Sequence, residues 1–206
     1  MTADHYLVPA GSADVELEVS RSRFVAHVAP VDDEDAARAV VAAVRARHPT
    51  AGHHCTAFVV GPDARLRRSN DDGEPSGSAG RPMLEVLTGR GVSDVVAVVS
   101  RWFGGTLLGV GGLVRAYGDA TMLALDAAGT RVRRRRLLVD VTVPVDLVGV
   151  VENRLRAAWD VVDVVYGTRV VLTLAVEPDR DGEVGATVAS LTSGRGDVST
   201  VGETWR

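Results

Sequence analysis

The chain has 206 residues, 46% hydrophobic and 24% charged, a composition typical of folded globular proteins and not of disordered ones. All 23 cationic side chains are arginine and the formal net charge is −4, which excludes a uniformly basic protein that coats nucleic acid. The single cysteine, Cys55, excludes an intrachain disulfide framework and any site with several cysteine ligands. The sequence has neither a long apolar run nor a signal-peptide layout, so we expect a cytoplasmic protein.

Hydrophobic spacing indicates the elements of the first half. The alternation of Val15, Leu17 and Val19 with glutamates predicts a strand that is buried on one face. Further strands are predicted over 22–29, 54–60, 65–69 and 95–99, the second and third of these as a hairpin and the last buried on both faces. Helices are predicted over 33–47, with Asp32 as N-cap, over 81–87, and over 111–128. The last helix is expected to bury Leu113, Ala116, Tyr117, Ala120 and Ala124.

A change of charge marks the expected domain boundary. Five of the six residues 131–136 are arginine, directly after Gly129, which is expected to end the long helix. Residues 65–136 hold 12 arginines against 7 acids, a net charge of +5, whereas residues 137–206 hold 6 arginines against 11 acids, a net charge of −5. We therefore predict a first domain over 1–130, an arginine-rich connector over 131–136, and a second domain over 137–206.

Elements alternate regularly in the second domain. Strands are predicted over 137–143, 161–166, 169–176 and 197–204, and helices over 147–158 and 181–192. Gly167 and Thr168 favour a two-residue hairpin loop of type II′, because glycine comes first. The order βαββαβ is that of the ferredoxin-like arrangement, so we predict an α+β protein of two domains. No residue cluster in this domain indicates a site.

The segment 69–82 is too polar and too rich in glycine and proline to form a helix or strand. Its acids Asp71, Asp72 and Glu74 are suited to hold a divalent cation or to act as general acid or base groups. The alternative, which we expect, is an ordered turn without a metal, whose carboxylates cap backbone amides and pair with Arg68 or Arg81. A third interpretation makes this acidic loop a surface for a protein partner.

A glycine-rich turn separates the strand over 95–99 from the helix that begins near Gly111. Its amide N–H groups and the positive end of the helix dipole are suited to hold an anion, and a side chain at Gly111 is expected to damage this site. The alternative is close backbone packing at a tight connection. The arginine run is also suited to contact phosphate. The residues predicted to bind an anion or nucleic acid are Arg101, Gly104, Gly105, Gly109, Gly111, Gly112, Arg115, Arg133, Arg134, Arg135 and Arg136.

His53, His54 and Cys55 invite a metal-binding interpretation, which their spacing does not favour. Adjacent strand residues point to opposite faces, so only His53 and Cys55 share a side, and no second pair of ligands follows at a zinc-like spacing. We expect no metal, no cofactor and a buried Cys55. Trp102 and Phe103 are suited to stack on bases, although adjacent aromatics more often anchor a loop to the core.

These segments resemble the YigZ/IMPACT family. The motifs that carry the resemblance are 22–26 (SRFVA), 53–55 (HHC), 71–77 (DDGEPSG), 79–82 (AGRP), 99–105 (VSRWFGG) and 108–117 (LGVGGLVRAY). In this order they are highly specific and cover nearly all of 20–128, and the rest of the chain is similar to the C-terminal domain of bacterial members. Trp102 departs from the family pattern, in which tyrosine is expected.

The resemblance implies a fold more than a reaction. It implies an N-terminal domain similar to one in a small-subunit ribosomal protein and in domain IV of elongation factor G. It implies a C-terminal domain similar to the last domain of that factor. Eukaryotic relatives regulate translation by competing for the activator of a kinase that phosphorylates an initiation factor, and no catalytic residues come with the resemblance.

We therefore expect a non-enzymatic, translation-associated protein that binds RNA or a ribosome-linked partner through its first domain. The local charge of +5 over 65–136, the glycine-rich turn and the resemblance favour this function. The alternative is an enzyme that acts on a phosphorylated small molecule at the glycine-rich turn 104–112. An enzyme is expected to use Asp71, Asp72 or Glu74 as well as the glycines, whereas an RNA-binding protein depends mainly on arginines.

Overall fold

The arginine run 131–136 is part of a long strand, β7 (Thr130–Val143), in the computed structural model, which describes residues 4–206. The chain divides into two compact units, Met1–Arg133 and Arg134–Arg206, so the division falls inside the run. The sequence predicted a connector here and a strand only from 137. The strand extends into the run because its backbone pairs with β1 and β10, and carboxylates neutralise three of its arginines, as described below.

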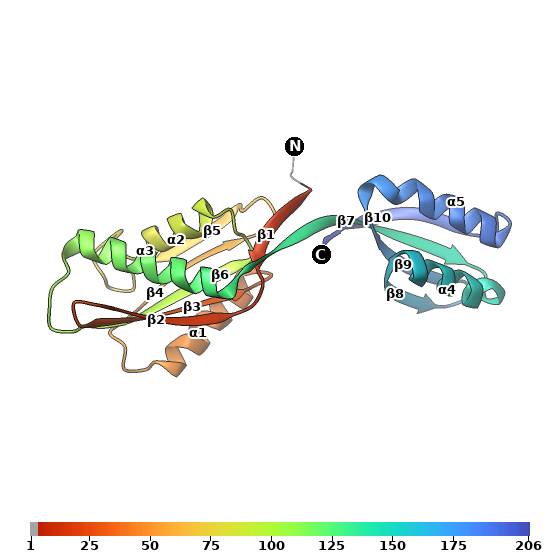
Figure 1. Ribbon diagram of the computed structural model, residues 1–206. Helices are drawn as coiled ribbons and strands as arrows, with labels where there is room; N and C mark the ends of the chain where they lie inside the picture. Colours follow the sequence, from red (N-terminus) through yellow and green to blue (C-terminus); the bar gives the residue numbers. More distant parts are fainter. Residues whose placement is uncertain (1–3) are drawn as a thin grey trace. The chain divides into compact units, whose positions relative to one another are not determined.

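The first unit is built on a sheet of five strands in the order β2-β3-β6-β4-β5, with every pair of neighbours antiparallel (Figure 1). The strands are β2 (Ala13–Val19), β3 (Ser22–Pro30), β4 (His53–Val60), β5 (Leu66–Asn70) and β6 (Val95–Trp102). All five were predicted, with boundaries that differ by up to three residues. A further strand, β1 (His5–Pro9), pairs with β7 and was not predicted.

Helices cover both faces of this sheet (Figure 1). One face packs on α1 (Glu34–Arg47), and the other packs on α2 (Gly80–Gly89) and α3 (Gly109–Ala128). The central strand β6 alternates between the two cores: Val95, Ala97 and Val99 lie in the core under α2 and α3, whereas Val96 and Val98 lie in the core under α1. The predicted burial of this strand on both faces is confirmed, as is that of the predicted α3 stripe.

Local chemistry sets the helix ends. The side chain of Asp33 accepts a hydrogen bond from the Ala36 N–H at 2.7 Å, so the N-cap of α1 is Asp33 and not Asp32 as predicted. Helix α3 ends before Gly129, whose φ of 66° suits glycine, and this predicted helix stop is confirmed. Helix α3 begins at Gly109, two residues earlier than predicted, so the last part of the glycine-rich turn is helical.

The second unit has the predicted order βαββαβ. Its elements after β7 are α4 (Val148–Ala158), β8 (Asp160–Tyr166), β9 (Val170–Val176), α5 (Asp181–Thr192) and β10 (Asp197–Trp205), with short 3₁₀ turns η1 (Val145–Leu147) and η2 (Pro178–Arg180). The strands lie side by side in the order β10-β7-β9-β8, all antiparallel. Side chains such as Val141, Leu172 and Leu155 form a core between one face of the sheet and the helices.

The loop between β8 and β9 differs from the prediction. It contains three residues, because Tyr166 pairs with Val170, and the Gly167 N–H donates to the carbonyl of Arg169 at 3.1 Å. Gly167 is not among the residues with a positive φ, so the predicted type II′ turn is wrong.

Candidate functional site

The acidic loop between β5 and α2 is an ordered turn held by its own carboxylates. Asp71 accepts hydrogen bonds from the backbone N–H groups of Gly77 (2.8 Å), Ala79 (3.0 Å) and Gly80 (2.8 Å). It therefore caps the start of α2 from nine residues away. Burial raises the pKa of Asp71, but the three hydrogen bonds outweigh this effect and bring the pKa below its ordinary value.

Asp72 ties the same loop to two other elements. One of its carboxylate oxygens accepts from the His54 N–H at 2.7 Å, and the other accepts from the Arg45 guanidinium at 2.6 Å. Burial raises the pKa of Asp72, and the bonds to Arg45 and His54 lower it further than burial raises it. The predicted capping role is thus confirmed for Asp71, whereas the predicted pairing with Arg68 or Arg81 is wrong, since Arg81 pairs with Glu85 at 2.8 Å.

These contacts predict that the acidic loop does not respond to divalent cations. Adding Mg²⁺ or Mn²⁺ should leave the melting temperature unchanged, because protein donors already occupy both carboxylates. Asp71→Asn should lower the free energy of unfolding by about 1–2 kcal/mol at neutral pH, because it weakens the cap of α2. The measurement is thermal and urea unfolding of both proteins, with and without each cation.

The pH dependence of this effect has a definite sign. Because the pKa of Asp71 is lower in the folded state, its stabilisation is present above the unfolded pKa of about 3.9 and is lost as pH falls through the folded pKa. The difference between the native protein and Asp71→Asn should therefore shrink in acid. Asp63→Asn, at an exposed position without a hydrogen bond to a described residue, is the control. A cation-dependent rise in melting temperature that Asp72→Asn abolishes would contradict this account.

Glu74 is the buried acid of the loop, with 8% of its surface exposed. Its Oε1 accepts from the Arg101 guanidinium at 2.7 Å and from the Tyr117 hydroxyl at 2.7 Å. Burial raises the pKa of Tyr117, so the hydroxyl remains a donor at neutral pH. The polar cluster thus joins the loop, β6 and α3 inside the core of the first unit.

Arg101 faces inward and is not available as a surface cation. It is 6% exposed, binds Glu74, and approaches the Ser22 hydroxyl at 3.4 Å. Its guanidinium lies 5.5 Å from the centre of the Phe24 ring and 5.7 Å from that of the Phe103 ring. The glutamate neutralises its charge, so the interpretation of Arg101 as an anion-binding residue is not favoured.

The glycines of the turn serve different purposes. A Cβ at Gly104 would lie 2.0 Å from the backbone C and O atoms of Arg21, so this glycine allows two segments to touch. Gly105 and Gly109 have φ values of +84° and +68°, which other residues rarely adopt. A Cβ at Gly111 meets nothing within 4 Å, so close backbone packing does not require glycine there. Close packing therefore explains only part of the motif.

A pocket of about 450 Å³ lies beside this turn. Glu74, Arg101 and His53 form its polar part, and Phe103, Leu107, Val110 and Leu113 are among its apolar walls. His53 is oriented by a 2.8 Å hydrogen bond from Nδ1 to the carbonyl of Asp72. The structure thus brings Glu74 and the glycine-rich turn together, while Asp71 and Asp72 are bound to backbone or to Arg45 outside the pocket.

Most arginines of the run 131–136 have carboxylate partners. Arg133 binds Asp94 at 2.6 Å and Asp32 at 2.9 Å, and Arg135 and Arg136 bind Glu203 and Glu177 at 2.7 and 2.8 Å. Burial lowers the pKa of Arg133, but its two acidic partners outweigh burial and raise it above the ordinary value. Arg115 and Arg134 form no ion pair with another described residue. The net charge of +5 over residues 65–136 therefore overstates the number of arginine side chains that are free to contact the phosphates of an RNA.

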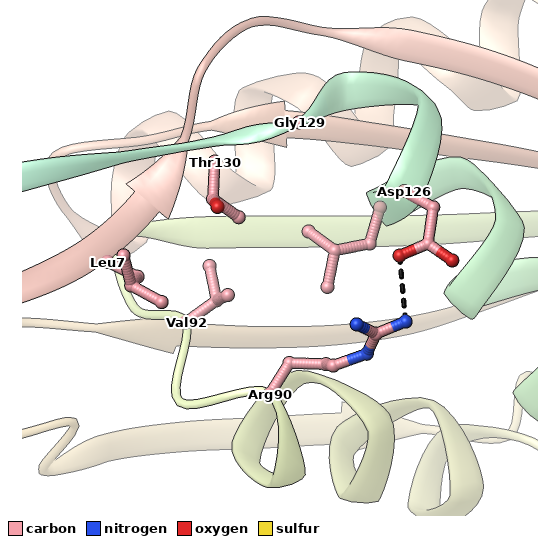
Figure 2. A pocket seen from close by; sticks show the side chains of 7 residues that line it. Leu7, Arg90, Val92, Asp126, Gly129 and Thr130 are labelled. Atoms are coloured by element: carbon pink, nitrogen blue, oxygen red, sulfur yellow. Dashed lines mark hydrogen bonds and ion pairs between the residues drawn. The ribbon is translucent and has the colours of Figure 1, made fainter.

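A second pocket of the first unit, of about 280 Å³, lies where α2 and α3 end (Figure 2). Arg90 and Asp126 form an ion pair of 2.7 Å at this pocket, and Leu7, Val92 and Thr130 are among its other lining residues. Its two charged groups neutralise each other, so no charge is left to fix a ligand.

The histidine and cysteine motif is structural. The His54 ring bonds to the Ser100 hydroxyl at 2.9 Å, and the Cys55 thiol donates to the carbonyl of Asp71 at 3.0 Å. Burial raises the pKa of Cys55 to about 12, so the thiol is unreactive at neutral pH. Within residues 4–206 no group of three His, Cys, Asp or Glu side chains is arranged to hold a metal, and no helix is long and apolar enough to cross a membrane.

Comparison with known proteins shows to which family the chain belongs. The family model described as the Impact N-terminal domain matches residues 20–125, more than half of the sequence. The chain belongs to the IMPACT family. A second model, described as a domain of unknown function (DUF1949), matches residues 141–195 in the second unit.

Relatives of similar length share both units. The chain is 34% identical to the IMPACT family member YvyE of Bacillus subtilis over 94% of this chain and 89% of that protein. It is 38% identical to the IMPACT family member YigZ of Escherichia coli over 93% and 95% of the two chains. The rat Protein IMPACT matches 43% of this chain, at 37% identity, and 29% of its own length. A solved structure described as that of a hypothetical protein has a TM-score of 0.78 and 35% identity, and it covers 97% of this chain and 98% of its own.

Proposed function

We propose that this IMPACT-family protein is a non-catalytic regulator associated with translation, and that its first unit binds a ribosome-linked protein. Membership of the family, which includes Protein IMPACT, supports the link to translation. The acids of the loop support a non-catalytic role, because Asp71 and Asp72 cap and pair inside the fold and Glu74 is bound to Arg101. RNA remains the other predicted partner.

An exposed apolar surface at the start of α3 carries this proposal. Phe103, Leu107, Val110 and Val114 are all exposed, Leu107 by 88%. They belong to one short segment, and Phe103, Leu107 and Val110 also line the pocket that contains Glu74. Neighbouring apolar side chains in water are costly, and such patches mark places where a protein meets another protein.

The charges beside this surface indicate the chemistry of the partner. Arg21 is exposed and donates to the Thr106 hydroxyl at 2.8 Å, and Arg115 is exposed on α3. The first turn of α3 holds no acid, so its N–H groups add positive potential. A protein segment with apolar side chains flanked by acids matches this surface. The aliphatic side chains Leu107, Val110 and Val114 offer little to RNA, whose phosphates need accessible cations.

A matched pair of substitutions tests the surface. Val110→Asp on α3 and Val150→Asp on α4 replace valines of similar exposure, 57% and 64%. Purified protein is mixed with ribosomes and ribosome-associated proteins of the same source, and binding is followed by sedimentation and crosslinking from position 107. We expect Val110→Asp to lower association at least tenfold and Val150→Asp to leave it unchanged.

Salt and nuclease separate the two kinds of partner. A protein contact made by apolar side chains should survive nuclease and change little between low and physiological salt. RNA binding should fall steeply with salt, because neutralised phosphates release counterions. Association that is lost in Arg134→Ser, disappears with nuclease and persists in Val110→Asp would overturn the proposal in favour of RNA.

A further inference from the structure

Four arginines converge on one pocket of the second unit. The pocket has a volume of about 380 Å³, and its charged side chains are Arg136, Arg156, Arg180, Arg206, Asp160 and Glu177. The arginines come from β7, the end of α4, the turn η2 and the residue after β10, so the fold gathers them from distant parts of the sequence. This contrasts with the acidic balance of residues 137–206, which hold 6 arginines against 11 acids.

Each of these arginines pairs with a carboxylate and keeps N–H donors that the carboxylate does not use. Arg136 pairs with Glu177 through Nη2 at 2.8 Å, and Arg156 pairs with Glu152 along α4 at 2.8 Å. Arg180 pairs with Glu183 at 2.9 Å, and Arg206 with Asp160. The side chains of Arg156, Arg180 and Arg206 are more exposed than that of Arg136, which has 22% of its surface exposed. Exposed ion pairs contribute little to stability, so these three arginines can turn to a stronger anion. Each guanidinium has five N–H groups, and the carboxylates use only one or two of them.

Trp159 provides an independent indication. The side chain lines the pocket and is 8% exposed, and its Nε1 is buried without a hydrogen-bond partner among the described residues. An indole N–H can only donate, so what it lacks is an acceptor. The Arg180 guanidinium lies 5.5 Å above the same ring, so the ring itself is covered and does not offer a stacking face.

We propose that this pocket binds the phosphate group of a small phosphorylated molecule. Arginine donors surround the space and the buried Trp159 Nε1 lacks an acceptor, so the complementary ligand is rich in acceptors and negatively charged. Two phosphate oxygens can accept hydrogen bonds from one guanidinium in a bidentate manner. Carboxylates on flexible, exposed side chains form this bidentate pair less readily. A long polyanion is disfavoured because the acids of the second unit repel phosphates outside the pocket.

The test uses the full chain and pyrophosphate as the probe. Isothermal titration calorimetry at constant ionic strength measures its affinity, with chloride and malonate as control anions. We expect pyrophosphate to bind at least tenfold more tightly than malonate. Arg180→Gln and Arg156→Gln should each lower the affinity at least fivefold. Arg195→Gln, which removes a similar exposed arginine paired with Asp146 at 3.3 Å outside the pocket, should leave it unchanged.

A conservative change of the indole adds a second readout. Trp159→Phe keeps a ring in the core and removes only the N–H donor, so it should weaken pyrophosphate binding while the melting temperature stays close to that of the native protein. Equal affinity for pyrophosphate and malonate, or equal loss in Arg195→Gln and Arg180→Gln, would overturn the proposal. Binding of an RNA oligonucleotide in this pocket without binding of pyrophosphate would also overturn it. These results are independent of the α3 surface, which Val110→Asp tests.

Discussion

Glu74→Gln should lower the free energy of unfolding of the first unit by about 3–5 kcal/mol, the loss expected when one partner of a buried ion pair is removed. The amide keeps the shape of the glutamate and cannot neutralise Arg101, whose side chain has 7% of its surface exposed. The buried guanidinium then lacks a counter-charge, and the Tyr117 hydroxyl loses a charged acceptor. Urea unfolding, with hydrogen exchange to assign the loss to the first unit, measures the effect.

Two comparisons make this prediction specific. Glu85→Gln breaks the exposed pair with Arg81 and should cost less than about 1 kcal/mol. The double substitution Glu74→Gln with Arg101→Met should recover part of the loss, because no unpaired charge remains in the core. A loss in Glu74→Gln that equals that in Glu85→Gln would show that the buried pair contributes no more than a surface pair.

Gly104→Ala should destabilise the first unit by about 3 kcal/mol or more, because overpacking against backbone cannot be relieved by a change of rotamer. The added Cβ would lie 2.0 Å from the C and O atoms of Arg21 and 2.4 Å from the Ser22 nitrogen. Either the turn or the β2–β3 connection must move. Because Ser22 also accepts a hydrogen bond from the Gly104 N–H at 3.2 Å, that movement breaks a contact as well.

Gly111→Ala is the matched control and should have the opposite sign. Its Cβ meets nothing within 4 Å, and the position is inside α3. Alanine is favoured over glycine inside a helix by about 1 kcal/mol, so a small gain in stability is expected. Urea unfolding of both variants and of the native protein measures the two changes in the free energy of unfolding. Similar losses in the two variants would mean that the close approach at Gly104 has no special cost.

Much of the fold could be predicted because hydrophobic periodicity reports burial. The continuous run Val95–Val99 and the α3 stripe predicted the strand and the helix directly, and Gly129 predicted the end of α3. The boundary of α1 was missed by one residue because Asp32 and Asp33 are chemically alike and only the bond to Ala36 separates them. The strand nature of 131–136 was missed because the strands that pair with it, β1 and β10, lie far away in the sequence.

The sites were harder to predict for the same reason. The sequence singled out Glu74, Arg101 and the glycines, but it could not show that Arg101 points at Glu74 across 27 residues, which inverts the expected role of the arginine. The four-arginine pocket gave no local signal at all. Arg136, Arg156, Arg180 and Arg206 are spaced by at least 20 residues, and only the sheet order β10-β7-β9-β8 brings them together.

The cap of α2 ties the motion of a helix to that of a loop. The residue before α2, Ala79, has no side-chain oxygen to satisfy the first N–H groups, and Asp71 supplies it from the far end of the loop. The helix therefore cannot fray from its start without releasing the loop, and the loop cannot open without exposing the helix end. We therefore expect residues 71–89 to open as one cooperative element, so that their amide protons exchange with solvent in shared opening events and not one by one.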